Sequence, residues 1–349
     1  MRKYCPLLMS LAFLSITGDL SAAQTPASKI DGFAIAVYNK GEFASPGFSD
    51  AVTRAKSMGA DWVGIHATFF QDGMRGTEIF DVNPAHGNST PGVEEQRTAV
   101  RAAHRAGLKV LLKPHVNLRS GEGWRGDIGT DMTQDEVGKW FASYGRLLLS
   151  HAKMAEEEHV EMLAVGTELT CTQGYESHWR ELIAKVRGVY SGPLVYCANH
   201  SEETKMKWWD ALDLIGIDAY YPLSEKKNPG LDELKAAWKP YLESCEALSR
   251  QYGRKILFAE LGYMSRAGTS TRPYDWTIPP EFDTAEQASC YQAFFETVYE
   301  QDWLAGVVWW SLTIHKPGTG DTDYTPEGKP AEALVRKWFG GAAEPAPAP

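Results

Sequence analysis

Eight short apolar segments recur along the chain, and their spacing constrains the fold more than any other feature of the sequence. They span 32–38, 62–70, 109–117, 161–169, 193–199, 214–222, 256–263 and 306–313. Between them lie segments of helical periodicity, such as EEQRTAVRAAHRAG and the single long stretch LDELKAAWKPYLESCEALSRQYG. Near-continuous apolar strands that alternate with helices form a parallel sheet covered on both faces. Eight such repeats predict an α/β protein, a single (β/α)8 TIM barrel.

The connections between these segments differ in length according to their direction. Helix-to-strand joints such as RAGLKV and QYGRKI are short. Strand-to-helix loops such as LRSGEGWRGDIGTD are long and rich in Gly, Pro and Trp. Barrel enzymes build their sites from the loops at the carboxyl ends of the strands. We therefore expect a functional site on that face of the barrel.

The charge and composition limit the class of partner. The chain has 349 residues, 43% of them hydrophobic, which is typical of a globular protein. Its formal net charge is -10 and its pI is about 5.5, so a surface that follows nucleic-acid phosphates is disfavoured. We expect a monomer that needs no cofactor.

The two ends of the chain differ in composition from the part between them. Arg2 and Lys3 precede a short apolar stretch and then small residues, which is typical of a secretory signal peptide over residues 1–23. The apolar stretch is too short for an ordinary membrane span, so no membrane anchor is expected. Residues 24–340 then form the catalytic barrel and residues 341–349 a flexible Pro/Ala tail. The mature protein is expected to be secreted, either extracellular or periplasmic.

Four cysteines remain after removal of the signal peptide, an even number in an exported chain. Cys171 and Cys197 follow or end neighbouring strands of the expected barrel. We hypothesise a disulfide between them, and two ordinary buried thiols are the alternative.

Two glutamates occupy matching positions at strand ends. Glu168 follows the apolar run MLAV and then Gly166 and Thr167, and Glu260 follows ILFA. In a barrel these are the fourth and seventh strands, which lie on roughly opposite walls. Glycoside hydrolysis needs an acid for the leaving oxygen and an anion that attacks carbon or activates water. Two carboxyl groups fill both roles if their surroundings separate their pKa values.

Other polar residues lie near the carboxyl ends of the strands. Lys113, His115 and Asn117 alternate on the third strand and therefore point the same way. On the sixth strand Asp218 and Tyr220 do the same, and a tyrosine beside a carboxylate can keep that carboxylate ionised by a hydrogen bond. We interpret Lys113, His115, Asn117 and Tyr220 as candidate substrate-binding residues.

Three further residues of the expected strands are candidates for the site. Asn199 ends the fifth strand, where it can bind a sugar hydroxyl or serve as a turn residue. His66 on the second strand is interpreted as a core histidine rather than a catalyst. Trp310 ends the eighth strand, where its indole face can stack on a pyranose ring. Loop aromatics can extend that surface, namely Trp124, Tyr274 and Trp276. The loop 320–324, GDTDY, is interpreted as solvated, and no metal site is predicted.

The ordered motifs GFAIAVY, KVLLKPHV, AVGTEL, IGIDAYYP, FAELGY and VVWWSL resemble those of glycoside hydrolase family 113, the β-mannanases of clan A. The resemblance covers roughly residues 30 to 340. It implies that Glu168 is the general acid/base and Glu260 the nucleophile of a retaining enzyme, with Tyr220 and Trp310 near the reacting sugar. One departure is Thr167, which stands where many clan members have an Asn that contacts the substrate 2-hydroxyl.

The resemblance implies an endo-β-1,4-mannanase acting on a polysaccharide or oligosaccharide such as mannan or glucomannan. A clan A β-glucanase or xylanase, an exo-acting mannosidase and a non-catalytic glycan-binding barrel are the alternatives. For a retaining enzyme, we expect a protonated Glu168, an ionised Glu260 and a separation of about 5–5.5 Å between their carboxyl groups.

Overall fold

The computed structural model describes residues 26, 28–83, 88–121 and 123–341. The expected signal peptide, residues 1–23, and all of the expected tail except Gly341 lie outside the described residues. Within them, no helix is both long and apolar enough to cross a membrane.

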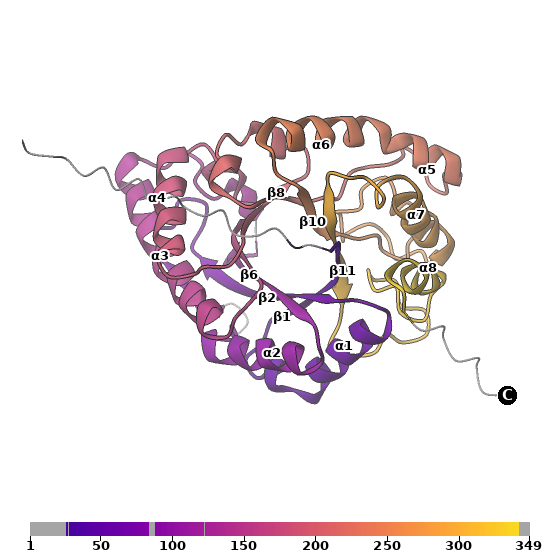
Figure 1. The fold of residues 1–349 in the computed structure, drawn as a ribbon, viewed down its shortest axis with the longest axis horizontal. Helices are drawn as coiled ribbons and strands as arrows, with labels where there is room; N and C mark the ends of the chain where they lie inside the picture. The colour runs from indigo at the N-terminus through magenta and orange to yellow at the C-terminus, as the bar shows by residue number, and fades with distance from the viewer. Residues whose placement is uncertain (1–25, 27, 84–87, 122, 342–349) are drawn as a thin grey trace, which may run out of the picture.

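Eight parallel strands form a closed barrel, as the sequence predicts (Figure 1). The first strand, β1, pairs with β2 on one side and with β11 on the other, and these two pairings close the sheet. The barrel strands in chain order are β1 (Ile30–Val37), β2 (Trp62–Gln71), β6 (Lys109–Leu118), β7 (Met162–Thr167), β8 (Leu194–Asn199), β9 (Leu214–Asp218), β10 (Ile256–Leu261) and β11 (Leu304–Leu312). Three two-residue strands lie in the loop after β2, namely β3 (Ile79–Phe80), β4 (Val82–Asn83) and β5 (Asn88–Ser89).

Helices surround the barrel in a ring (Figure 1). They are α1 (Pro46–Ser57), α2 (Val93–Arg105), α3 (Gln134–Glu157), α4 (Glu176–Arg187), α5 (Leu231–Ala237), α6 (Lys239–Tyr252), α7 (Thr284–Thr297) and α8 (Pro330–Phe339). The connection from β8 to β9 contains two short 3-10 helices instead, η4 (Glu203–Lys205) and η5 (Trp209–Ala211). Trp208 is buried there and stacks on Trp179 of α4, so large side chains fill the space beside the sheet.

The stretch 231–253, expected as one helix, forms two. The first ends at Ala237, and α6 starts at Lys239 with Pro240 in its first turn. A proline has no amide hydrogen to donate, and its ring clashes with the carbonyl four residues earlier. The break at Trp238 follows from that single residue.

The carboxyl ends of the strands carry the long connections. Between β2 and α2, β6 and α3, β10 and α7, and β11 and α8 the chain makes extended loops, whereas α2 and β6 are joined by 106–108 alone. Apolar side chains fill the inside of the barrel, among them Leu111, Ala164, Val195 and Val308. The polar residues at the strand ends therefore lie above these packed apolar side chains, at the face of the barrel that the loops surround.

Candidate active site

Glu168 and Glu260 lie at the carboxyl ends of β7 and β10. Glu168 follows the last residue of β7 and has a left-handed backbone, with φ 51°. Its amide donates to the carbonyl of Cys197 at 2.8 Å, and the next amide, of Leu169, donates to the Tyr196 hydroxyl at 3.1 Å. The neighbouring strand β8 thus holds Glu168 in a conformation that non-glycine residues rarely adopt, and such conformations cluster at functional sites.

Both carboxyl groups line one cavity of about 780 Å³ at this face of the barrel. Residues from the strands β1, β6, β8 and β11 and from the loops around them complete the wall. The remaining lining residues are Ala36, Tyr38, His115, Trp124, Arg125, Asn199, His200, Tyr220, Tyr274, Trp276, Trp310, Ser311, Leu312, Thr313, Asp323 and Tyr324. A concave site with many aromatic side chains and a few convergent polar groups is suited to a carbohydrate.

Glu260 accepts hydrogen bonds on both of its carboxyl oxygens. Lys113 Nζ lies 2.5 Å from Oε1, and the Tyr220 hydroxyl donates to Oε2 at 2.9 Å. Although burial by itself lowers the pKa of Lys113, the carboxylates of Asp218 and Glu260 raise that pKa above its usual value, so Lys113 is an ammonium ion. Donors of this kind favour the ionised form of a carboxylate.

Asp218 shares the ammonium group of Lys113, at 2.8 Å from Oδ1, but its Oδ2 has no hydrogen-bond partner among the described residues. Burial first, and then the neighbouring Glu260, raise the pKa of Asp218 well above its usual value. Of the two carboxyl groups around Lys113, Glu260 has hydrogen-bond donors on both oxygens and Asp218 on one, so the negative charge of Glu260 is the better stabilised.

Glu168 has different surroundings. Its side chain is 13% exposed, and Arg125 Nη1 lies 3.7 Å from Oε2. Burial raises the pKa of Glu168, and Glu260 raises it further, while Arg125 and Lys113 lower it. The net direction of the pKa of Glu168 is upward, so its surroundings favour the protonated form.

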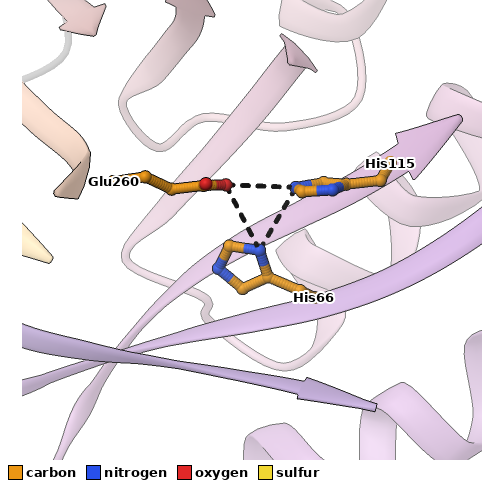
Figure 2. A group of neighbouring side chains, drawn as sticks. All are labelled: His66, His115 and Glu260. Carbon is orange, nitrogen blue, oxygen red and sulfur yellow. Dashed lines mark hydrogen bonds and ion pairs between the residues drawn. The ribbon is translucent and has the colours of Figure 1, made fainter. Parts of the chain in front are cut away.

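His66, His115 and Glu260 form a compact group (Figure 2), and two of them, His115 and Glu260, line the cavity. His66 Nδ1 lies 3.2 Å from His115 Nε2, and these two nitrogens lie 3.9 and 3.6 Å from Glu260 Oε1. Three such donor atoms can surround a metal ion. Here, however, the Lys113 ammonium already binds the same Glu260 oxygen, and a second cation is held by His115, namely Arg125. The donor set therefore fits a hydrogen-bonded group better than a resident metal.

The hydrogen-bond directions within this group follow from Arg125. Arg125 Nη1 can only donate, so His115 Nδ1, at 2.8 Å, is an acceptor. Burial, followed by the positive charges of Arg125 and Lys113, lowers the pKa of His115 well below its usual value, so its ring is neutral. The proton of a neutral ring then lies on Nε2, which faces His66 Nδ1 and Glu260.

The residues that were predicted to bind substrate divide into three groups. His115, Asn199, Tyr220 and Trp310 line the cavity, as expected for such a role. Lys113 is fully buried and reaches Glu260 from below, because its long side chain points into the barrel. It is not among the residues that line the cavity. Asn117, one residue before the end of β6, is half-buried and lies outside the cavity lining.

His66 is buried, as predicted for a core histidine, but it also contacts the group around Glu260. Its ring lies 5.3 Å from that of Trp310. Gly64, two residues earlier, leaves room for the ring, since a Cβ there would lie 2.7 Å from His66 Nε2. The two histidines and Trp310 thus pack together beside Glu260.

Aromatic side chains rise from the loops around the cavity. Trp124, Tyr274 and Trp276, which were expected to extend the Trp310 surface, all line it and are 39%, 47% and 73% exposed. Tyr274 stacks on His200, with ring centres 5.2 Å apart. Exposed aromatic rings beside a cavity provide flat surfaces for pyranose rings.

Several lining residues have no counterpart in the sequence predictions, namely Tyr38, Arg125, His200, Asp323 and Tyr324. Arg125 is the most informative of them, because it contacts both His115 and Glu168. The sequence contained a weak indication that Arg125 lies near the site, because this residue follows Trp124 in a long loop at the carboxyl end of a strand. The direction of its side chain depends on how that loop folds.

The Asp-containing loop 320–324 surrounds a lysine ammonium group. Lys329 Nζ lies 2.7 Å from Asp321 Oδ1, 3.1 Å from the carbonyl of Asp323 and 2.8 Å from that of Thr325. These three oxygens therefore have a cationic partner within the chain. This arrangement places Asp323 and Tyr324 at the cavity wall.

The hypothesised Cys171–Cys197 disulfide is wrong, because both cysteines are free. Cys197 belongs to the apolar filling inside the barrel. Cys171 is exposed on the loop after β7, where it accepts a hydrogen bond from Thr130 at 3.3 Å. Cys171 follows β7 and Cys197 lies within the adjacent strand β8, but their side chains occupy different layers of the fold.

The sequence profile of Glycoside Hydrolase Family 113 matches residues 33–329. The chain belongs to glycoside hydrolase family 113. It is therefore a glycoside hydrolase, and the resemblance found in the sequence is confirmed.

Solved structures agree with this assignment. A family 113 β-1,4-mannanase is 31% identical, with a TM-score of 0.80, and the match covers 90% of this chain and 100% of that one. The family 113 β-mannanase AaManA from Alicyclobacillus acidocaldarius, in complex with ManMIm, is 29% identical, with a TM-score of 0.80 and coverage of 90% and 97%. A β-glucuronidase from Faecalibacterium prausnitzii shares the fold, at 13% identity and a TM-score of 0.59, over 90% of this chain and 49% of its own. No curated protein matches the chain.

Proposed function

We propose that this family 113 enzyme is a retaining endo-β-1,4-mannanase that cleaves mannan or glucomannan by double displacement. The observation that carries the mechanism is the difference between the surroundings of its two glutamates. Glu260 accepts hydrogen bonds from Lys113 and Tyr220, whereas burial and Glu260 raise the pKa of Glu168. One carboxyl group is thereby suited to attack and the other to donate a proton.

In the first step Glu260 attacks the anomeric carbon and forms an ester bond to it. The bond between that carbon and the leaving oxygen breaks, and the oxygen takes the proton of Glu168. In the second step Glu168 removes a proton from water as the water oxygen attacks the same carbon. The ester bond breaks, Glu260 regains its charge, and the sugar leaves with its original configuration.

The substrate class is supported by the solved family members, two of which are described as β-1,4-mannanases. A clan A β-glucanase or xylanase is the nearest alternative, and an exo-acting mannosidase is another. Release of reducing sugar from mannan, cellulose, xylan and β-glucan separates the first two. The lengths of the products from mannohexaose separate endo from exo action. No release from any mannan would refute the proposed substrate.

The roles of the two glutamates predict different variant behaviour. Glu260→Ala should abolish turnover of every substrate, because no ester bond can form. Glu168→Ala should keep activity on aryl mannosides whose leaving groups need little protonation, and added azide should increase it. We also expect a carboxyl separation of about 5–5.5 Å in a crystal structure, against about 6.5–9.5 Å for an inverting enzyme. An inverted first product in an NMR time course would contradict the retaining mechanism.

We also propose that the enzyme acts outside the cytoplasm as a monomer after removal of residues 1–23. This proposal is supported by the basic, apolar and small-residue pattern of the N-terminus. Mass spectrometry of the exported protein should give an N-terminus at Gln24, and gel filtration should give the mass of one chain. Recovery of the full-length chain in the cytoplasm would refute export.

A further inference from the structure

Arg125 occupies a position between the candidate acid/base and the group around the nucleophile. It begins the short helix η2 (Arg125–Asp127) in the loop from β6 to α3. Its Nη1 atom lies 2.8 Å from His115 Nδ1 and 3.7 Å from Glu168 Oε2. The guanidinium group is therefore bonded to a neutral ring while it stays just outside hydrogen-bond distance of the acid.

The loop that carries Arg125 is tied to the segment that carries Glu168. The Tyr175 hydroxyl donates to the carbonyl of Gly129 at 3.2 Å, and Thr130 donates to Cys171 at 3.3 Å. Both contacts join the loop after β6 to the loop after β7. These contacts hold one loop against the other, and the bond to His115 directs the Arg125 side chain between them.

A direct pair between arginine and a carboxylate strongly favours the ionised acid, and a proton donor so paired would be largely deprotonated at neutral pH. At 3.7 Å the positive charge still favours the carboxylate, but without a short hydrogen bond. The contact with His115 accounts for this distance, because it directs Nη1 toward the histidine ring.

We propose that Arg125 is a positioning residue that, held by His115, sets how readily Glu168 releases and regains its proton. The inference rests on the acid/base role proposed above for Glu168. It adds to that role the positive charge of Arg125 and the distance between Arg125 and Glu168. Substitution can change each of them.

The groups that act on Glu168 come from several elements packed around it. They are Arg125 of η2, Lys113 of β6, Asp218 of β9, Tyr220 just after β9, and Glu260 of β10, while His115 of β6 contacts Arg125. Within the described part of the chain, the ion pair with Glu168 is made by Arg125. Removal of Arg125 is therefore the substitution that should change the proton affinity of Glu168 most directly.

The charge of Arg125 has a different effect in each half of the reaction. Before attack, the negative charge of Glu260 opposes ionisation of Glu168, and Arg125 partly offsets it. After attack, Glu260 is part of a neutral ester, so this opposition ends. Arg125 and Lys113 then favour the carboxylate form of Glu168, which is the form that removes a proton from water.

The first test replaces the charge. Arg125→Met should raise the pKa of Glu168 by about one unit, since an opposite charge at this range lowers a carboxyl pKa by about 1–3 units. The alkaline limb of kcat/KM, which reports the free enzyme, should move to higher pH by the same amount. Arg125→Lys keeps the charge and should move the limb by less than about half a unit.

The second test changes the distance. In His115→Leu the acceptor of Arg125 is gone, so the guanidinium group is free to pair with Glu168. The alkaline limb should then move to lower pH, opposite to its movement in Arg125→Met. Arg119→Met is the matched control, because Arg119 binds Asp72 at 2.9 Å and does not line the cavity. Its limb should coincide with that of the wild type.

Titration of Glu168 by ¹³C NMR in the free enzyme checks the same shifts without substrate. An unchanged Glu168 titration in Arg125→Met, or shifts of the same sign in both variants, would overturn the inference. A purely structural role would lower activity at every pH and leave the limb in place. Failure of the proposed function would show instead as full activity on mannan in Glu168→Ala, a result that the NMR titration does not depend on.

Discussion

At the scale of single residues, the site depends on one buried ammonium group. Lys113 lies between Asp218 and Glu260, and each of these carboxyl groups accepts from it. Removal of one member of a buried charged group leaves the others without compensation, which costs about 3–5 kcal/mol. Lys113 therefore links the stability of the barrel interior to the charge of the proposed nucleophile.

Tyr220 provides the second hydrogen bond to Glu260, and its loss should affect activity more than folding. Tyr220→Phe removes a bond to a charged group, worth about 2 kcal/mol, so kcat/KM should fall about 30-fold. Tyr221→Phe is the matched control, since the Tyr221 hydroxyl donates to Glu203 instead, at 2.7 Å. Steady-state kinetics on one mannan oligosaccharide would compare them. Equal losses in the two variants would mean that the contact with Glu260 has no special role.

At the scale of elements, the loop from β10 to α7 presents aromatic rings on a braced backbone. Arg266 donates to the carbonyls of Trp276 and Ile278 at 2.9 and 2.8 Å, and the Tyr324 hydroxyl donates to that of Pro273 at 2.8 Å. A loop held in this way loses little conformational freedom when a ligand binds. Its exposed rings are therefore suited to hold a long glycan in place.

Trp276 should contribute to binding of long substrates and little to stability, because 73% of it is exposed. Trp276→Ala should raise KM for mannan and mannohexaose about 3- to 10-fold, corresponding to about 1 kcal/mol for one ring contact. Turnover of a small aryl mannoside should change little. Phe282→Ala is the control, since Phe282 is 54% exposed on the same loop but does not line the cavity. A similar KM change in both variants would contradict the role of Trp276.

At the scale of the whole molecule, a charged group at the amino-terminal end of the barrel should make stability depend on pH. Asp31 of β1 accepts from the Tyr299 hydroxyl at 2.7 Å, and its amide donates to Asp61. Burial, opposed by the Tyr299 hydrogen bond and reinforced by Asp61, raises the pKa of Asp31 to about 6. The folded state thus binds a proton at Asp31 more tightly than the unfolded chain does.

The stability that Asp31 contributes should decrease as pH rises. Between the unfolded pKa of about 3.9 and the folded value, the native state holds more protons, so the contribution of Asp31 to stability falls as pH rises. Asp31→Asn keeps an acceptor for Tyr299 and carries no charge. Its melting temperature should exceed that of the wild type at pH 7 and match it near pH 4, as measured by thermal unfolding. A difference of the same size at both pH values would exclude titration of Asp31 as the cause.

The sequence by itself determined the barrel and the location of its site. Period and length of the apolar runs define the strands, and the unequal connections identify the functional face, because strand direction is fixed in a parallel sheet. Glu168 and Glu260 could be identified in this way, because a residue at the carboxyl end of a barrel strand lies at the functional face. Pro240, which causes the helix break at Trp238, is also visible in the sequence. The helical periodicity on both sides of this proline nevertheless predicted one continuous helix.

Only the tertiary structure decided which side chains meet. Lys113 and Glu260 are far apart in sequence, and their contact depends on how strands from different parts of the chain close the barrel. The same closure brings His66 beside His115, places Cys197 inside the barrel away from Cys171, and leaves Asn117 outside the cavity. Arg125 depends on a loop whose backbone has no periodic pattern. Periodicity constrains the position of a residue along its own element, whereas contacts across the barrel depend on packing among all of the elements.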